Sequence, residues 1–139
     1  MAISDGDKAG ARGGVRRLLR LEGLALLLAA LGLFAKTSGD WRLFALLFLV
    51  PDVSFAFYLF GPRAGSFAYN MMHSTLGPLI LAAAVFPLHL PVALAVTLIW
   101  FAHIGLDRAL GYGLKYATGF GDTHLGAIGR KAMQASAAH

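Results

Sequence analysis

Acidic and imidazole side chains interrupt otherwise apolar stretches of this sequence. Asp52 lies in the second such stretch, His73 in the third, and His103 and Asp107 in the fourth. Imidazole nitrogens and carboxylate oxygens are the ligands that zinc, iron or manganese take where no thiolate is present, and the chain has 0 cysteines. These four residues therefore predict a site for a divalent transition metal, which could activate water or a substrate oxygen.

Further polar residues have the chemistry to support such a site. Glu22 and Asn70 are expected to orient the ligands or position a substrate. Asp122 and His124 lie in the C-terminal segment and are candidates for additional ligands or positioning groups. The predicted centre thus draws on every apolar stretch of the chain and on its tail.

The apolar stretches themselves predict a membrane protein. Of the 139 residues, 58% are hydrophobic and only 14% are charged, and the mean hydropathy is +0.66. A helix crosses a bilayer with about 20 apolar residues. We expect four such helices, and their predicted ranges are 18–36, 41–60, 65–86 and 91–112.

Short connections rich in Gly, Pro, Ser and Asp separate these ranges, and short links favour antiparallel neighbours. The predicted fold is an all-α, polytopic, four-helix antiparallel transmembrane bundle over residues 18–112. A basic polar arm precedes it at 1–17, and a tail follows it at 113–139. A cleaved signal peptide is the competing interpretation of the first stretch, but Glu22 interrupts its apolar run.

The candidate ligands share one depth in these helices. Asp52, His73 and His103 each lie about nine residues, or about 13 Å, from the same end of the bundle. Asn70 and Asp107 lie one turn nearer that end, on the faces of His73 and His103, because residues three or four apart share a helix face. We therefore expect one layered pocket, and side chains more than about 8 Å apart would exclude a shared metal.

Charge distribution predicts the orientation. If both termini are cytoplasmic, all but two of the 12 Lys and Arg residues fall on the inner side, and the exceptions are Lys36 and Arg42. This is the positive-inside pattern. The net charge of +5 is thus expected to contact anionic membrane lipids and not nucleic acid.

The segment 111–130 is rich in glycine and aromatic residues and too polar for a fifth span. We expect it to lie at the interface and to fold back against the cytoplasmic mouth of the bundle. The alternative is a loosely ordered surface tail.

Several motifs together resemble a family of small bacterial integral membrane proteins known only as a domain of unknown function. The resemblance implies a four-helix fold and a location in the bacterial inner membrane, and it implies no activity. The motifs that carry it are 22-EG-23, 51-PD-52, 69-YN-70 with His73, 103-HIGLDRALGYGLKY-116 and 119-GFGDTHLG-126.

Three functions are compatible with these residues. The first is a metal-dependent membrane enzyme, a hydrolase or an oxidoreductase, that acts on a lipid or another hydrophobic substrate. The second is a proton or ion transporter that uses the same residues. Because four helices form only a thin pathway, that function would require a homo-oligomer. The outer halves of the predicted spans also lack ionisable groups, so no continuous polar path reaches the other side. The third is a structural or interaction protein whose polar core fixes helix packing.

Overall fold

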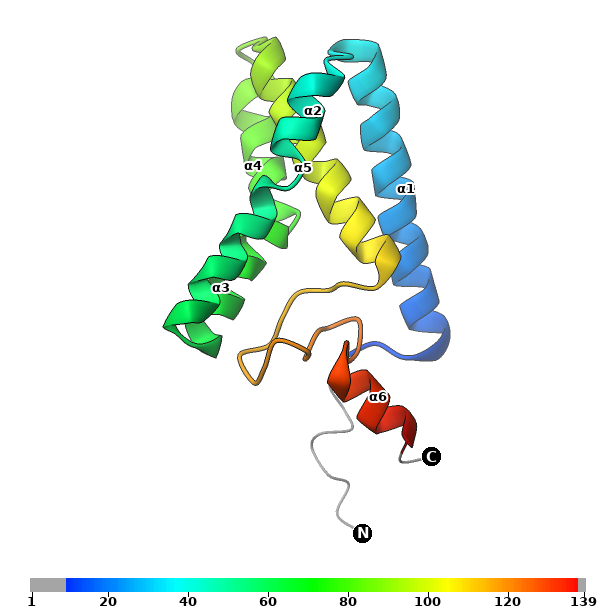
Figure 1. The fold of residues 1–139 in the computed structure, drawn as a ribbon. Coiled ribbons are helices and arrows are strands. Elements are labelled where there is room, and N and C mark those ends of the chain that lie inside the picture. Colours follow the sequence, from blue (N-terminus) through cyan, green and yellow to red (C-terminus); the bar gives the residue numbers. More distant parts are fainter. Residues whose placement is uncertain (1–9, 138–139) are drawn as a thin grey trace.

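The protein is all-helical in the computed structural model, which describes residues 10–137. Within that range, the β-type pairing is limited to an isolated antiparallel bridge between Lys115 and Thr123. The all-α prediction is therefore confirmed. The helices, in chain order, are α1 (Gly13–Thr37), α2 (Trp41–Leu47), the 3-10 helix η2 (Val50–Phe60), α3 (Pro62–His73), α4 (Leu76–Val85), α5 (Pro91–Leu110) and α6 (Arg130–Ala137) (Figure 1).

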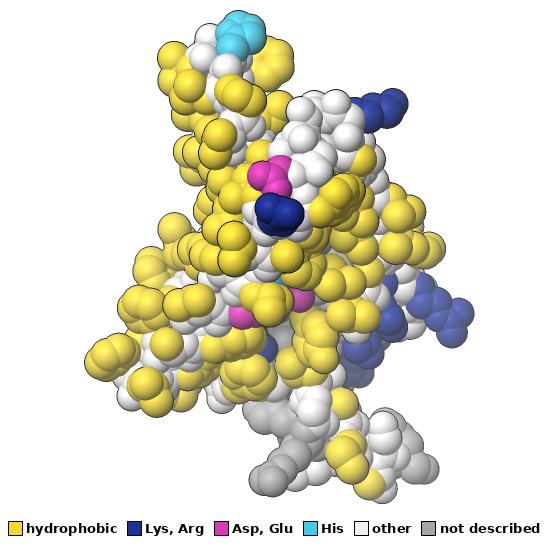
Figure 2. All heavy atoms as spheres, turned by 45° about the horizontal axis from the view of Figure 1, so that its top comes forward, with side chains coloured by type: hydrophobic (Ala, Val, Ile, Leu, Met, Phe, Trp, Pro, Cys, Tyr) yellow, Lys and Arg dark blue, Asp and Glu magenta, His cyan; other side chains and the backbone are white. Residues whose placement is uncertain are grey.

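Three helical segments are long and apolar enough to cross a membrane: Gly13–Thr37, Trp41–Phe60 and Pro91–Leu110. Large hydrophobic side chains such as Leu28 and Leu46 are exposed on them, and Figure 2 shows hydrophobic side chains over most of the visible face. An apolar surface of this extent is stable in lipid and not in water. These features indicate a membrane protein.

The prediction of one unbroken third helix over 65–86 was wrong. The chain forms α3, takes an extended backbone at Ser74, and starts again as α4. Pro78 explains the position of the break, because a proline ring clashes with the carbonyl of the residue four positions earlier, here Ser74. The structure thus has three candidate spans and one shorter apolar helix, where four spans were expected.

A second break follows the same rule. The helix α2 ends at Leu47, four residues before Pro51, and the chain continues as η2. Non-helical backbone within a membrane is tolerated where it is buried in protein or lines a cavity. Pro51 is buried, and the residue after it is Asp52, so this break places a carboxylate inside the fold.

Glycines allow the first half of α1 and the end of α5 to pack closely, where the two helices converge (Figure 1). A Cβ at Gly105 would lie 2.6 Å from the Leu27 backbone nitrogen, and one at Gly23 would lie 2.7 Å from the Ala109 nitrogen. Small residues at such crossings are typical of membrane helix pairs. Beyond these glycines, a hydrophobic core continues along α1 and α5; its buried residues are Phe34, Ala95, Leu98 and Ile99.

The predicted N-terminal arm falls partly outside the described residues, since the structure describes it only from Gly10 onward. There, the Ala11 amide donates to the His124 carbonyl (2.6 Å). The end of the arm therefore lies against the tail, which passes beneath the end of α5 (Figure 1).

A methyl group at the α1 and α5 crossing should destabilise the fold. We expect Gly105→Ala to lower the free energy of unfolding by about 1 to 3 kcal/mol, because the new Cβ meets backbone atoms of α1 that cannot move aside. Thermal unfolding in detergent measures the effect. Gly32→Ala is the matched control: no atom lies within 4 Å of its Cβ position, so its melting temperature should be unchanged or higher. Equal melting temperatures for the two variants would contradict the close crossing.

Candidate metal centre

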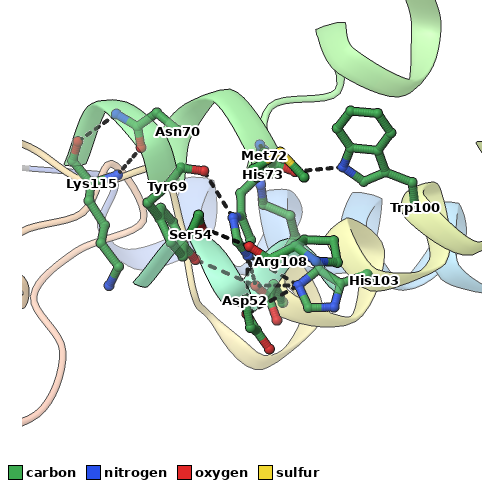
Figure 3. Close-up of polar contacts among 12 residues, drawn as sticks. Asp52, Ser54, Tyr69, Asn70, Met72, His73, Trp100, His103, Arg108 and Lys115 are labelled. Atoms are coloured by element: carbon green, nitrogen blue, oxygen red, sulfur yellow. Dashed lines mark hydrogen bonds and ion pairs between the residues drawn. The ribbon is translucent and has the colours of Figure 1, made fainter. Parts of the chain in front are cut away.

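Two helix breaks and one long helix bring four side chains together. Asp52 stands on the first turn of η2, His73 is the last residue of α3, and His103 belongs to α5 (Figure 3). Asp107 lies one turn further along α5. Each residue offers a nitrogen or oxygen ligand atom, and these atoms all lie within 4.8 Å of one another. The structure thus joins the four residues that the sequence predicts as metal ligands.

The ligand atoms have the spacing of a metal coordination shell. His73 Nε2 lies 3.3 Å from Asp52 Oδ1 and 3.4 Å from Asp107 Oδ2. His103 Nε2 lies 3.4 and 3.6 Å from the same two oxygens, and the two histidine nitrogens are 3.1 Å apart. Tetrahedral bonds of 2.0 to 2.2 Å place ligands about 3.3 to 3.6 Å apart. These five distances are close to that range, and all the ligand atoms lie within 4.8 Å of one another.

The tautomer of His73 suits a metal ligand. Its Nδ1 lies 2.9 Å from the Tyr69 backbone carbonyl. A carbonyl only accepts hydrogen bonds, so Nδ1 carries the proton and donates. The lone pair on Nε2 is then directed at the cluster, as in metal sites where the second ring nitrogen is fixed by a backbone oxygen.

Acceptors outnumber protons at the centre of the cluster. His73 Nε2 has a lone pair there, and Asp52 and Asp107 supply two carboxylates. The Tyr69 hydroxyl donates to Asp107, and a proton on His103 Nε2 could satisfy one further acceptor. His103 Nδ1 is buried without a hydrogen-bond partner among the described residues. Converging lone pairs repel one another unless a cation lies between them. The donor set therefore fits a bound metal ion.

The cluster is closed on its histidine side and open on its carboxylate side. The side chains of His73 and His103 are 3% and 2% exposed, whereas those of Asp52 and Asp107 are 35% and 19% exposed. A small molecule would therefore meet the carboxylates first.

Side chains of α5 satisfy the backbone where α3 ends. Trp100 Nε1 donates to the Met72 carbonyl (2.6 Å), and Arg108 donates to the His73 carbonyl (3.3 Å) (Figure 3). The last carbonyls of a helix have no partners within it, and in an apolar setting they need them. Arg108 and Trp100 therefore hold the end of α3, and with it His73, against α5.

Tyr69 belongs to the candidate site but was not predicted as a site residue from the sequence. Its ring stacks on His73 with centroids 3.7 Å apart, and its hydroxyl donates to Asp107 Oδ2 (3.4 Å). The signal was available, because Tyr69 precedes His73 by four residues and so shares its helix face. Tyr69 thereby orients two of the four candidate ligands.

Asn70 contacts the tail and not the ligand cluster. Its side-chain amide donates to the Lys115 carbonyl (2.7 Å), and its side-chain oxygen accepts from the Lys115 amide (2.7 Å). The paired bonds resemble a strand pairing and dock the tail on α3.

Lys115 is a second residue that the sequence analysis missed. Its ammonium group donates to the Phe120 carbonyl (3.0 Å) and lies 3.7 Å from the Phe120 ring centroid and 4.8 Å from that of Tyr69. Burial lowers the pKa of Lys115 to about 8, against an attraction to Asp107 that raises it. Favourable contacts with aromatic faces offset part of the cost of burying this charge.

The remaining predicted site residues lie outside the four-residue cluster. Glu22 is exposed on α1. Asp122 accepts a hydrogen bond from the Thr118 hydroxyl (2.7 Å), within the tail. His124 Nδ1 accepts from the Leu114 amide (2.8 Å), so it too is used in folding the tail.

Comparison with known proteins identifies the chain at the level of a family. A family model described as "Domain of unknown function (DUF4260)" matches residues 16–128. The chain belongs to this family. The matched region contains the four cluster residues and the tail through His124, so the resemblance seen in the sequence motifs is confirmed. No curated protein and no solved structure matches the chain.

Removing the Asn70 side chain should release the tail. In Asn70→Leu the Lys115 amide and carbonyl lose their partners, which should make the free energy of tail docking about 1 to 3 kcal/mol less favourable. Hydrogen exchange at tail amides should then be about tenfold faster or more. Met71→Leu, which changes an exposed neighbour, is the control and should exchange like the wild type. Unchanged protection in Asn70→Leu would mean that other contacts dock the tail.

Acid should also loosen the tail. Burial and the positive charge of Arg108 lower the pKa of His124, and its Nδ1 must be unprotonated to accept from Leu114. As the pH falls, His124 is therefore protonated at a higher pH when the tail is undocked than when it is docked. Docking should be constant above about pH 6.5 and weaken as the pH falls below it.

Hydrogen-exchange protection of tail amides, corrected for the intrinsic rate at each pH, measures this dependence. His124→Gln keeps an acceptor for the Leu114 amide without a titrating group, so its protection should vary less between pH 7.5 and 5. A parallel loss of protection in both proteins would contradict the assignment.

Proposed function

We propose that this protein is a metal-dependent membrane enzyme that acts on a lipid or another hydrophobic substrate. The observation that carries the proposal is the convergence of four candidate ligand atoms, from Asp52, His73, His103 and Asp107, at a point where acceptors outnumber protons. Buried acceptors in this arrangement are stable around a cation. Zinc, iron and manganese all accept this set of ligands, and we assign the metal to that group.

The two faces of the cluster suit different tasks. The buried imidazoles of His73 and His103 would hold the ion in place, while Asp52 and Asp107 line the accessible side. A bound divalent metal would supply Lewis acidity there, for hydrolysis or, with iron, for oxidation. Tyr69 would keep the Asp107 carboxylate oriented, and the tail, docked through Asn70, would limit the entry of water.

A hydrophobic substrate follows from the surroundings of the cluster. Asp52 and Asp107 belong to the apolar segments Trp41–Phe60 and Pro91–Leu110, and exposed hydrophobic side chains cover the adjoining surface (Figure 2). A molecule that reaches the carboxylates from the bilayer would be largely apolar. The excess of basic residues at the tail end supports an orientation with both termini in the cytoplasm, in a bacterial inner membrane.

Transport is less well supported than catalysis. The ring of Phe48 lies 5.4 Å from that of His103, and Phe48 packs on the hydrophobic cluster built around Phe34 and Ile99. An ion leaving the site in that direction would cross an apolar layer at high cost. A transport pathway would therefore have to form between copies of the chain.

Metal analysis of purified protein tests the proposal. The wild type, supplied with zinc, iron or manganese and purified without chelator, should carry about one ion per chain. His73→Asn and His103→Asn should each retain less than about a tenth of that metal, because each removes a ligand. His89→Asn is the matched control, since His89 is exposed in the turn before α5 and has a positive φ of 49° that asparagine tolerates.

Two results would contradict a metal centre at the cluster. One is a wild-type protein that remains substoichiometric in every metal. The other is equal metal loss in all three histidine variants, which would show a general effect of removing histidines.

A further inference from the structure

A second candidate site lies at the start of α1, among arginines that have no acidic partner. Arg16, Arg17 and Arg20 occupy the first two turns of the helix. Arg20 Nε donates to the Ala109 carbonyl (2.8 Å), and Arg16 Nε is buried without a hydrogen-bond partner. Within the part of the chain that the structure describes, no ion pair joins Arg16, Arg17 or Arg20 to an acidic side chain.

The local electrostatics favour an anion from outside the chain. Arg16 and Arg20 are four residues apart, where like charges repel. The first turn of α1 has no acidic residue, and its unpaired amides add positive charge. The carbonyls at the end of α5 offset only part of this positive charge, because Arg20 makes a single hydrogen bond to them, at Ala109.

A cavity of about 290 Å³ adjoins these arginines. Arg17 and Arg20 line one part of it, and Leu21 and Leu24 line the other, with Ala109 of α5 as a wall. Because Arg20 is held through Nε, its two terminal nitrogens remain available as a fork that matches a phosphate group. The cavity is therefore basic at one end and apolar at the other.

Its position matches the boundary of a bilayer. Arg17 and Arg20 stand near the beginning of the candidate span Gly13–Thr37, and the leucines follow in the direction of its apolar interior. Figure 2 shows basic side chains grouped along one flank, directly beside hydrophobic ones. A lipid has the same order of groups, with a charged headgroup at the boundary and a chain along the span.

We propose that Arg17 and Arg20 bind the phosphate of an anionic glycerophospholipid, whose acyl chain lies along Leu21 and Leu24. A free phosphate would leave the leucines without a role, and a zwitterionic lipid would leave the positive charge uncompensated. The site is separate from the metal centre, since α5 contacts α1 through Gly105 and presents His103 and Asp107 to η2 and α3. The proposal does not depend on the proposed enzymatic function.

Native mass spectrometry of the full-length protein in detergent tests this site, with phosphatidylglycerol, phosphatidylcholine and inorganic phosphate as probes. Phosphatidylglycerol should bind the wild type about tenfold more tightly than it binds Arg17→Gln/Arg20→Gln. The double variant Lys36→Gln/Arg42→Gln removes the same charge at the end of α1 and the start of α2, and it should bind like the wild type. Arg17→Gln alone keeps the Arg20 bond to Ala109 and should still weaken binding.

Three outcomes would overturn the site: equal weakening in both double variants, equal binding of phosphatidylcholine, or displacement of the lipid by millimolar inorganic phosphate. The metal content of each variant is measured in parallel. The arginine double variant should lose lipid and keep its metal, whereas His73→Asn should lose metal and keep its lipid. The two proposals can therefore fail independently.

Discussion

The convergence of two carboxylates and two imidazoles in one small volume is the constraint on which the rest of this structure depends. Asp52, His73, His103 and Asp107 come from three separate elements, and their candidate ligand atoms all lie within 4.8 Å of one another. So many acceptors in an apolar setting need compensating protons or a cation, and rigid elements must hold them. The surrounding structure provides that rigidity through the backbone bond to His73 and the α5 side chains that fix the end of α3.

The two proline-directed breaks make the group possible. In a regular helix through 65–86 the Met72 and His73 carbonyls would be paired within the helix, whereas the break after His73 frees them for Trp100 and Arg108. The break before Pro51 places Asp52 on the first turn of η2. Local loss of regular helix is thus used to aim ligands, as in other membrane proteins whose binding sites lie at interrupted helices.

The sequence was sufficient to predict the helical class and the meeting of four candidate ligands, because burying an ionisable residue in an apolar stretch has a large cost that residue type alone reveals. Matching depths then indicated that Asp52, His73 and His103 meet. The break at Ser74 was not predicted, although Pro78 marked it, since prolines are common in membrane helices and many only bend them. The hydrogen bonds between Asn70 and Lys115 were not predicted. They depend on the path of the glycine-rich tail, and hydrophobic periodicity does not specify that path.

The 3-10 geometry of η2 has a consequence for how this region tolerates changes in length. With three residues per turn, Asp52, Phe55 and Tyr58 stand in a single row. The first is a candidate ligand, and the rings of the other two lie 5.5 and 5.3 Å from Phe120 in the tail. A deletion or insertion of one residue within this row would rotate the carboxylate by about 120° relative to the rings. An insertion or deletion of three residues would restore the alignment. Related chains that keep both the ligand cluster and the packing of Phe120 on η2 should therefore differ here in length by multiples of three residues.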